Sequence, residues 1–297
     1  MDAKSSTIYD VAKVAGVSIS TVSRVLNVPH QVREPTRQKV LQAIERLQFV
    51  PKAEAIARAR KTFGRIGVLT PSLTMLSFVE RLRGVAHALH NTDYELIVYS
   101  VTNATQLQHH LDLLSASKRV DGLVVMTLPI DKKSLTRLLT NRVEVVCIEV
   151  TNPLCCNITV NNTLGGELVA QYFLEKGYQA CAYVGESFDI APETNNSAKR
   201  LQGFQEGFHK HGIELPEAYI RLLPLAMENV MDGVMAQTHH LLDLPDPPEA
   251  IFTYSDLYAI GVLKAARSRN LAIPEDLALI GFDNIDVADF MELTTVN

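Results

Sequence analysis

The sequence predicts a small all-α head followed by a large α/β body, and three observations support that fold class. The first 50 residues hold three short amphipathic helical patterns, whereas the remainder alternates apolar, strand-like runs with helical patterns. The charge divides in the same region: residues 1–61 carry 11 Lys and Arg against 5 Asp and Glu, and the remainder carries 17 against 28. The head therefore has a net charge of +6 and the body one of −11. A basic head suits a polyanionic partner, the alternative being a solvated charged surface.

The first two helical patterns are joined by a tight turn. Thr7 and Asp10 have the spacing of a capping box, and the helix that they start is expected to end at Gly16. Ser18 can cap a second helix, and a third helix is expected from about Pro35. Such a helix-turn-helix can present the polar start of its second helix to the major groove of DNA. The alternative is a plain helical hairpin with a hydroxyl-rich cap.

The body contains seven strand-like runs, at residues 65–71, 94–100, 120–126, 143–150, 179–185, 249–256 and 276–284. The alternation of strand and helix breaks at residues 151–166, where a short extended segment is expected to cross over. We therefore divide the body into two similar doubly wound lobes, about 63–160 and 161–293. A ligand is expected between the lobes, at the carboxyl ends of the strands.

Several classes of function are disfavoured by what the sequence lacks. It has no G-x-G-x-x-G after a strand, no G-x-x-x-x-G-K-[ST] and no G-x-S-x-G. Its four cysteines, Cys147, Cys155, Cys156 and Cys181, show no C-x-x-C spacing and are expected to be reduced thiols. We expect neither a metal nor a cofactor. Since no apolar run approaches the roughly 20 residues of a membrane span, we also expect no membrane association and a cytoplasmic location.

Two long stretches of the head carry a resemblance to a known family. The segments TIYDVAKVAGVSISTVSRVLN (residues 7–27) and VREPTRQKVLQAIERLQFVP (residues 32–51) resemble the DNA-binding head of the lactose/galactose repressor (LacI/GalR) family. The resemblance implies that Ile19, Ser20 and Arg24 read base edges, with Arg24 able to form two bonds to guanine. It assigns phosphate contacts and register to five further residues, namely Tyr9, Thr21, Ser23, Asn27 and Thr36.

The linker departs from the family pattern. The resemblance implies a head at residues 1–50 and a hinge helix at residues 51–62, in which a leucine wedges into the minor groove and kinks the duplex. Here Arg58 stands at the leucine's place. We expect the segment to fold on DNA with Arg58 favouring a narrow groove and little kink, and Ile56 to be the candidate wedge if a kink persists.

Three stretches of the body resemble the effector-binding core of the same family, which is similar to periplasmic sugar-binding proteins of type I. They are KRLQGF (residues 199–204), YSDLYAIGVLKAAR (residues 254–267) and PEDLALIGFDNID (residues 274–286). The resemblance extends over the core at residues 63–297. It implies that Arg200 anchors an effector through its guanidinium fork and that Asp283 accepts bonds from effector hydroxyls.

The resemblance assigns smaller roles to three more residues. Ser255 and Glu149 would orient the effector from strand ends, and Phe78 would supply an apolar wall. Asp256 is kept outside the site, because an aspartate after a strand often caps the next helix. For Arg200 and Asp283 the alternative is an ordinary surface ion pair.

The sequence as a whole is interpreted as a transcriptional repressor. The resemblance implies a homodimer on a near-palindromic operator and a small effector, with a sugar as the first expectation and a nucleoside or purine behind it. Family members usually continue past LTTVN by another crossover, strand and helix, so one lobe is expected to lack its final elements. The alternatives are a sugar-binding transport protein and a sugar-processing enzyme that uses Asp256, Asp283 and Glu149, and we expect no enzyme activity.

Overall fold

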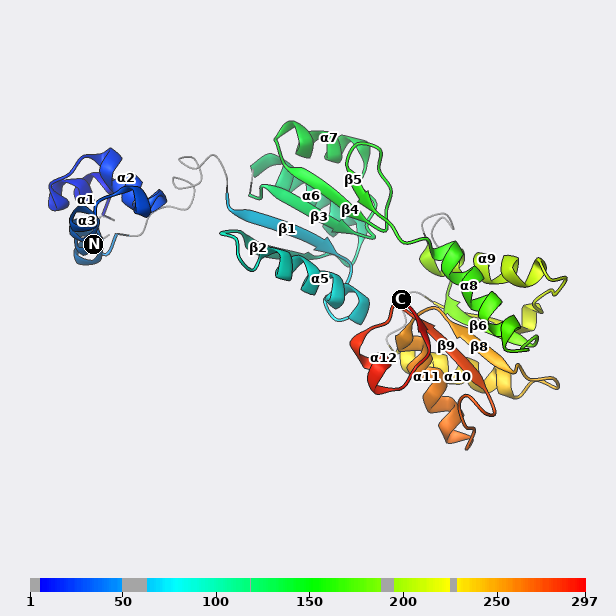
Figure 1. The fold of residues 1–297 in the computed structure, drawn as a ribbon. Coiled ribbons are helices and arrows are strands. Elements are labelled where there is room, and N and C mark those ends of the chain that lie inside the picture. Colours follow the sequence, from blue (N-terminus) through cyan, green and yellow to red (C-terminus); the bar gives the residue numbers. More distant parts are fainter. Residues whose placement is uncertain (1–5, 50–62, 118, 188–194, 225–228) are drawn as a thin grey trace. The chain divides into compact units, whose positions relative to one another are not determined.

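The structure is a computed structural model that describes residues 6–49, 63–117, 119–187, 195–224 and 229–297 (Figure 1). The described residues fall into two compact units, one within residues 1–72 and 85–158 and the other within residues 73–84 and 159–297. The first unit contains the helical head and one parallel sheet, and the second contains another parallel sheet. The predicted fold class, a helical head followed by an α/β body, is confirmed.

The head consists of three α-helices around one small core. They are α1 (Ile8–Ala15), α2 (Ile19–Asn27) and α3 (Glu34–Leu47), with a 3-10 turn at Pro29–Gln31 between the last two. Their buried side chains are Val11, Ala12, Val22, Val25, Val40 and Ala43. These side chains are small because three short helices have to cross closely around a single apolar centre.

The ends of the head helices form as the sequence predicts. The Thr7 and Asp10 side chains each accept a hydrogen bond from the other residue's backbone N–H, which completes the capping box of α1. Gly16 ends α1 in the left-handed conformation, with φ 65°, where a side chain would be strained. The Ser18 hydroxyl accepts a hydrogen bond from the Thr21 N–H and so caps α2. The turn is therefore specified by local chemistry.

The sheet of the first unit has five parallel strands in the order β2-β1-β3-β4-β5. They are β1 (Arg65–Thr70), β2 (Glu95–Ser100), β3 (Gly122–Met126), β4 (Glu144–Ile148) and β5 (Cys156–Ile158). Helix α5 (Leu76–Leu89) follows β1, α6 (Ala104–Ser117) follows β2 and α7 (Lys132–Thr140) follows β3. The core on one face joins α6 and α7 to the strands through leucines such as Leu111, Leu114, Leu135 and Leu138.

The sheet of the second unit is also parallel, in the order β10-β9-β8-β6-β7. Its strands are β6 (Cys181–Glu186), β7 (Ile220–Leu223), β8 (Ala250–Thr253), β9 (Ala278–Phe282) and β10 (Thr295–Val296). Its helices are α8 (Asn162–Glu175), α9 (Asn196–His209), α10 (Val230–Leu242), α11 (Asp256–Ser268) and α12 (Asp286–Phe290), with a 3-10 turn at Glu217–Tyr219. Counted from β7, the strand order repeats that of the first sheet.

Alternating residues of the second sheet pack against different helices. Tyr183 and Phe252 belong to a core shared with α8 and α9, whereas Val184 and Ile251 belong to a core shared with α10 and α11. The two pairs of helices lie on opposite faces of the sheet (Figure 1). Because both faces are covered, the central strands β6, β8 and β9 are apolar at most positions, which is why they stand out in the sequence.

Helices α8 and α9 approach each other closely through glycines. A Cβ at Gly203 would lie 1.8 Å from the Thr163 carbonyl oxygen, and one at Gly166 would lie 2.0 Å from the Arg200 carbonyl oxygen. These contacts are to backbone atoms, which cannot rotate away as a side chain can. The absence of side chains at these two positions therefore fixes where α9 carries Arg200.

We expect Gly203→Ala to lower the free energy of unfolding by about 1–3 kcal/mol or more, because the new methyl group overpacks a helix contact. Gly84→Ala is the matched control, since Gly84 also lies within a helix but a Cβ there would meet no atom within 4 Å. That change should instead stabilise by about 0.5–1 kcal/mol. Denaturant unfolding followed by circular dichroism measures both, and equal effects would contradict the close contact.

Candidate nucleic-acid interface and effector site

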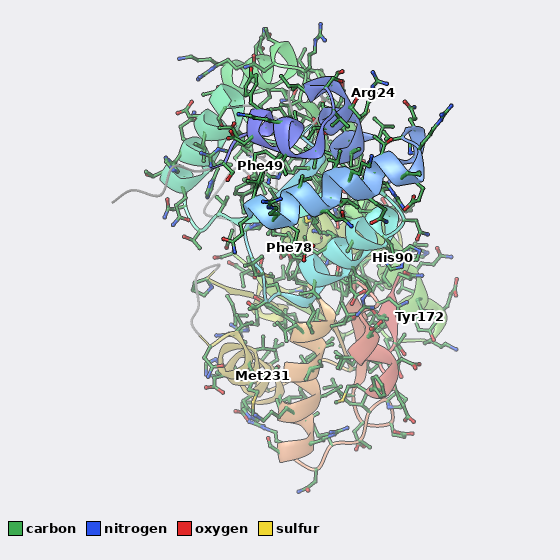
Figure 2. The ribbon with its side chains drawn as sticks, turned by 90° about the vertical axis from the view of Figure 1, so that its left-hand side faces the viewer. Arg24, Phe49, Phe78, His90, Tyr172 and Met231 are labelled. Atoms are coloured by element: carbon green, nitrogen blue, oxygen red, sulfur yellow. The ribbon has the colours of Figure 1, made fainter. Side chains whose placement is uncertain are left out.

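The second helix of the head presents a mixed apolar and polar surface. Ile19 is 41% exposed although it is a large apolar residue, and Ser20 and Arg24 are exposed beside it. Arg24 points outward from the head (Figure 2). Tyr9, on α1, is 67% exposed. The exposed apolar side chains are not needed by the core of the head, which makes them available to a partner.

The hydroxyl groups at the start of α2 are arranged by one another. The Ser18 hydroxyl oxygen lies 2.8 Å from that of Ser20 and 2.9 Å from that of Thr21. At the other end of the helix, the Asn27 amide donates to the Ser23 carbonyl oxygen at 2.8 Å. No acidic residue lies in the first turn of α2, so the positive end of the helix dipole is available to a phosphate.

The predicted DNA-contact residues divide into three groups. Tyr9, Ile19, Ser20 and Arg24 are exposed, whereas Thr21, Ser23, Asn27 and Thr36 are half-buried. The two linker candidates, Ile56 and Arg58, lie outside the described residues. Thr36 lies in the first turn of α3, so the N-termini of two helices carry predicted phosphate contacts.

In the second unit, polar side chains gather at the carboxyl ends of the strands. Glu186 ends β6, Ser255 comes two residues after β8, and Asp283 directly follows β9. The chain leaves β6 for β7 on one side and returns to β8 on the other, so the strand order reverses between β6 and β8. In open α/β sheets, ligands bind outside the carboxyl ends at such a switch point.

Arg200 is a deeply buried cation of this region, with 3% of its surface exposed. Its Nε donates to the Asn162 side-chain oxygen at 2.8 Å, and one terminal nitrogen donates to the Tyr254 carbonyl oxygen. The guanidinium carbon also lies 3.5 Å from the centroid of the Phe282 ring, a cation–π contact. A buried guanidinium is tolerated only with partners of this kind.

The second terminal nitrogen of Arg200 lies 3.3 Å from an Asp283 carboxylate oxygen. Side-chain exposure is 4% for Arg200 and 18% for Asp283, so this pair is not an ordinary surface ion pair. Asp283 has φ 103°, a backbone conformation that non-glycine residues adopt at a cost. The structure thus brings these two predicted residues together, with Asp283 as the more accessible member.

Glu186 is a member of this region that the sequence analysis missed. It is 9% exposed, and burial raises its pKa to about 7 against the charge of Arg200 and hydrogen bonds from Tyr258 and Tyr254. The Asp283 carboxylate acts in the same direction as burial. In the sequence, Glu186 could have been recognised as a site residue because it is the polar residue that ends the apolar strand CAYVGE. A buried carboxyl of this kind at a strand end marks a functional-site candidate.

Asp256 serves a different purpose from the one expected. Its side chain does not cap α11 but accepts hydrogen bonds from the Ile285 N–H at 2.9 Å and from the Thr295 hydroxyl. A Cβ at Gly281 would lie 2.2 Å from the Asp256 carboxylate, so the glycine makes room for it. Asp256 therefore joins the start of α11 to the loop after β9 and to β10, which supports leaving it outside the site.

The other two predicted effector residues, Glu149 and Phe78, are both buried. Glu149 directly follows β4, is 7% exposed and has φ 63°, and its N–H donates to the Ile158 carbonyl oxygen at 2.9 Å. Phe78 lies near the start of α5 and is 7% exposed, with the Arg81 guanidinium 5.1 Å from the centroid of its ring. Phe78 is therefore a buried ring flanked by a cation.

A capped helix-turn-helix joined to two parallel sheets with polar groups at the strand ends defines a DNA-binding protein built on a small-molecule-binding fold. Comparisons with known proteins agree with this class. The family described as bacterial regulatory proteins, lacI family, matches residues 7–52, and the periplasmic binding protein-like domain matches residues 170–297.

Individual relatives match over nearly the whole chain. Catabolite control protein A of Priestia megaterium is 31% identical over 98% of this chain and 86% of that protein. The ribose operon repressor of Escherichia coli (strain K12) is 31% identical over 98% of this chain and 88% of that protein. The lac repressor dimer bound to operator and the anti-inducer ONPF is 25% identical, with a TM-score of 0.78 over 98% of this chain and 87% of that one.

The chain belongs to the LacI family of bacterial regulatory proteins and is a DNA-binding transcriptional regulator. The resemblance found in the sequence is thereby confirmed. The relatives are named as regulators and repressors, not as enzymes. Among the residues that the structure describes, no helix combines the length and the apolar character that crossing a membrane requires.

The raised pKa of Glu186 makes stability depend on pH. The folded protein keeps this proton up to about pH 7, whereas the unfolded chain loses it near the ordinary pKa of 4.5. The stability that this group contributes is complete below pH 4.5 and is lost as the pH rises through about 7. A shift of this size corresponds to about 3 kcal/mol.

We expect Glu186→Gln to match the wild type in acid and to exceed it in free energy of unfolding by up to about 3 kcal/mol above neutral pH, because glutamine stays uncharged. Denaturant unfolding over a pH series measures this difference. The control is Glu275→Gln, at an exposed position. Parallel pH curves for the wild type and Glu186→Gln would refute the assignment.

Proposed function

We propose that this protein represses transcription as a homodimer on a near-palindromic operator, and that a small effector of the sugar or nucleoside class controls its operator affinity. The observation that carries the first part is the capped α2, which exposes Ile19, Ser20 and Arg24 on one basic head. The relatives' names and the operator-bound lac repressor dimer support the same assignment. A regulator of this kind acts in the cytoplasm.

The head supplies both kinds of DNA contact. Arg24, Ile19 and Ser20 read base edges in the major groove, and Arg24 forms two bonds to a guanine. Five residues contact phosphates and fix the register, namely Tyr9, Thr21, Ser23, Asn27 and Thr36. The half-buried hydroxyl and amide groups among them are held by neighbouring side chains and backbone, so binding requires little further ordering. For the linker at residues 51–62, which lies outside the described residues, the proposed contact with the minor groove is made by Arg58 or alternatively by Ile56.

The effector site uses the strand ends. Asp283 accepts hydrogen bonds from effector hydroxyls, and Arg200, which is held by Asn162, the Tyr254 carbonyl oxygen and Asp283, anchors the effector through the remaining N–H groups of its guanidinium. Glu186 adds a second acceptor beside the same guanidinium. Glu149, Ser255 and Phe78 are the other residues that we propose to contact the effector. A sugar is the first expectation, because carboxylates at strand ends suit ligands with many hydroxyl donors and because one relative is named for ribose.

The role of these groups is binding and not catalysis. The carboxylate of Asp256 is bonded to Thr295 and to the backbone of Ile285, and that of Asp283 is bonded to Arg200. Both carboxylate oxygens of Asp256 are therefore engaged by the protein, and the carboxylate of Asp283 is paired with a cation. The proposed domains of the chain are a head (residues 1–50), a linker (residues 51–62) and a core (residues 63–297), and the core has lobes at about 63–160 and 161–293.

Selection of bound sequences from a random duplex pool, with and without a panel of sugars and nucleosides, tests the whole proposal. A palindromic consensus whose recovery changes with one class of panel compound is the expected result. Because coupling between sites is reciprocal, a compound that weakens operator binding must bind less tightly to the DNA-bound protein. If the recovered sequences share no common motif, the proposal is overturned.

For the base contact, we expect Arg24→Ala to weaken binding to the selected operator by about 1–3 kcal/mol and to relax the preference at one base pair in each half-site. Arg46→Ala is the control, since Arg46 is an exposed basic residue in the last turn of α3. Affinity measurements on single-substitution operators distinguish the outcomes. If Arg24→Ala lowers the affinity for every operator variant by the same amount, Arg24 contacts a phosphate and not a base.

For the effector, we expect Asp283→Asn to raise the concentration of the active panel compound needed for half of its effect by about 10- to 100-fold. That range corresponds to one lost hydrogen bond to a charged group, about 1.5–3 kcal/mol. Asp289→Asn is the control, at an exposed position in α12. Operator-binding titrations at fixed protein concentration provide the measurement, and an unchanged half-point in Asp283→Asn would exclude the contact.

A further inference from the structure

Two thiols lie side by side in the first unit. The Cys147 and Cys155 sulfur atoms are 3.4 Å apart, and both side chains pack on the same apolar core. Cys147 is fully buried in β4, Cys155 is half-buried before β5, and the neighbouring Cys156 is exposed. All three belong to the four cysteines that are free in this structure.

The pairing of β4 with β5 explains why Cys155 and not Cys156 meets Cys147. Cys147 is opposite Asn157 in the parallel register, and Cys156 is opposite Val146. Side chains alternate between the two faces of a sheet, so Cys155 shares the face of Asn157 and Cys147, whereas Cys156 belongs to the other face. The juxtaposition is therefore set by strand register.

The bend that carries Cys155 is held by hydrogen bonds. The Asn152 N–H donates to the Asn157 side-chain oxygen at 2.8 Å, and the Asn157 amide donates back to the Asn152 carbonyl oxygen at 2.8 Å. The same amide donates to the Cys155 carbonyl oxygen at 3.0 Å. These bonds keep Cys155 close to Cys147 without a covalent link.

We propose that Cys147 and Cys155 form an oxidisable dithiol, a modification site whose reactant is a hydroperoxide and whose oxidised form is an intrachain disulfide. A disulfide requires sulfur atoms at about 2.05 Å and Cα atoms about 4.4–6.8 Å apart. Cys155 precedes by two residues the Asn157 that is opposite Cys147, so the two cysteines are diagonal neighbours, and their sulfur atoms already converge to 3.4 Å across that diagonal. Rotation of the half-buried Cys155 side chain supplies the remaining approach.

The reaction balances in two steps. In the first, the Cys155 thiolate attacks one peroxide oxygen: an S–O bond forms, the O–O bond breaks, and the leaving oxygen takes a proton to give water or an alcohol. In the second, the Cys147 sulfur attacks the Cys155 sulfur: the S–S bond forms, the S–O bond breaks, and the leaving hydroxide takes the Cys147 proton as water. Two thiols lose two electrons in total, and the peroxide gains them.

The order of the steps follows from the surroundings of each thiol. Burial, and then the hydrogen bond with Cys155, raise the pKa of Cys147 to about 12, so this group remains a thiol and reacts with peroxide poorly. Cys155 is the member that solvent reaches. Cys147 then acts as the resolving thiol, because the sulfenic acid forms in direct contact with it.

The disulfide would enclose a ring of residues 147–155 that contains Glu149. Glu149 is strained, with φ 63°, and is joined to β5 by its N–H bond to the Ile158 carbonyl oxygen. Oxidation would therefore link β4 covalently to the residue that precedes β5. The consequence for effector binding rests on the proposed function of Glu149, whereas formation of the disulfide does not.

Peptide mapping of the full chain tests the proposal without DNA or effector, so its failure is distinguishable from failure of the proposed function. Reduced protein is treated with hydrogen peroxide, alkylated in denaturant and cleaved after glutamate, which cuts at Glu149 between Cys147 and Cys155. The expected products are two alkylated cysteines in place of four, and a linked pair of peptides joining residues 145–149 to the fragment that starts at Val150.

Two single variants locate the link. Cys156→Ser, the matched control one residue away, should retain the linked peptides, and Cys155→Ser should lose them. Should Cys155→Ser fail to fold, the link in Cys156→Ser alone still assigns the partner of Cys147. The proposal is overturned if Cys147 stays fully alkylated after oxidation, if Cys156→Ser removes the link, or if the link joins two chains.

Discussion

The burial of Arg200 is the interaction on which the second unit depends. A guanidinium that is 3% exposed has lost its water and must be surrounded by acceptors and aromatic faces. The acceptors come from α8, from the end of β8 and from the residue after β9, and the ring of Phe282 covers one face. Elements that are far apart in the chain therefore have to meet at one cation.

The glycines of α8 and α9 meet this requirement. Asn162 reaches the Arg200 Nε only because α8 lies directly against α9, and Gly166 and Gly203 permit that approach. Asp283 is then held at 3.3 Å from the same guanidinium while retaining more exposure than its partner. Packing between two helices thus determines which member of this ion pair is the more exposed.

The sequence predicted best those features that depend on nearby residues. The capping box of Thr7 and Asp10, the turn at Gly16 and the Ser18 cap are all interactions within about three residues, and each appears as expected. Each of the seven apolar runs contains a strand, because the buried strands of a parallel sheet are apolar at most positions. The strands β7 and β10 were missed, because four and two residues leave too little pattern.

Contacts between distant residues were harder to predict. Arg200 and Asp283 are 83 residues apart, and the sequence offered them as site residues only through a family resemblance. The prediction that Asp256 caps the next helix was wrong, because its partners Ile285 and Thr295 come from the loop after β9 and from β10. Glu186 was overlooked because no periodic pattern marks a single carboxyl at a strand end. Its raised pKa arises from burial beside groups supplied by other elements.

The shared strand order of the two sheets has a consequence for biosynthesis. In each sheet the first strand to be made lies second from one edge, and its two neighbours are the next strands to be made. A nascent chain can therefore add every later strand at a border that already exists, without waiting for sequence still inside the ribosome. Each half of the body can be assembled in the order in which it is translated.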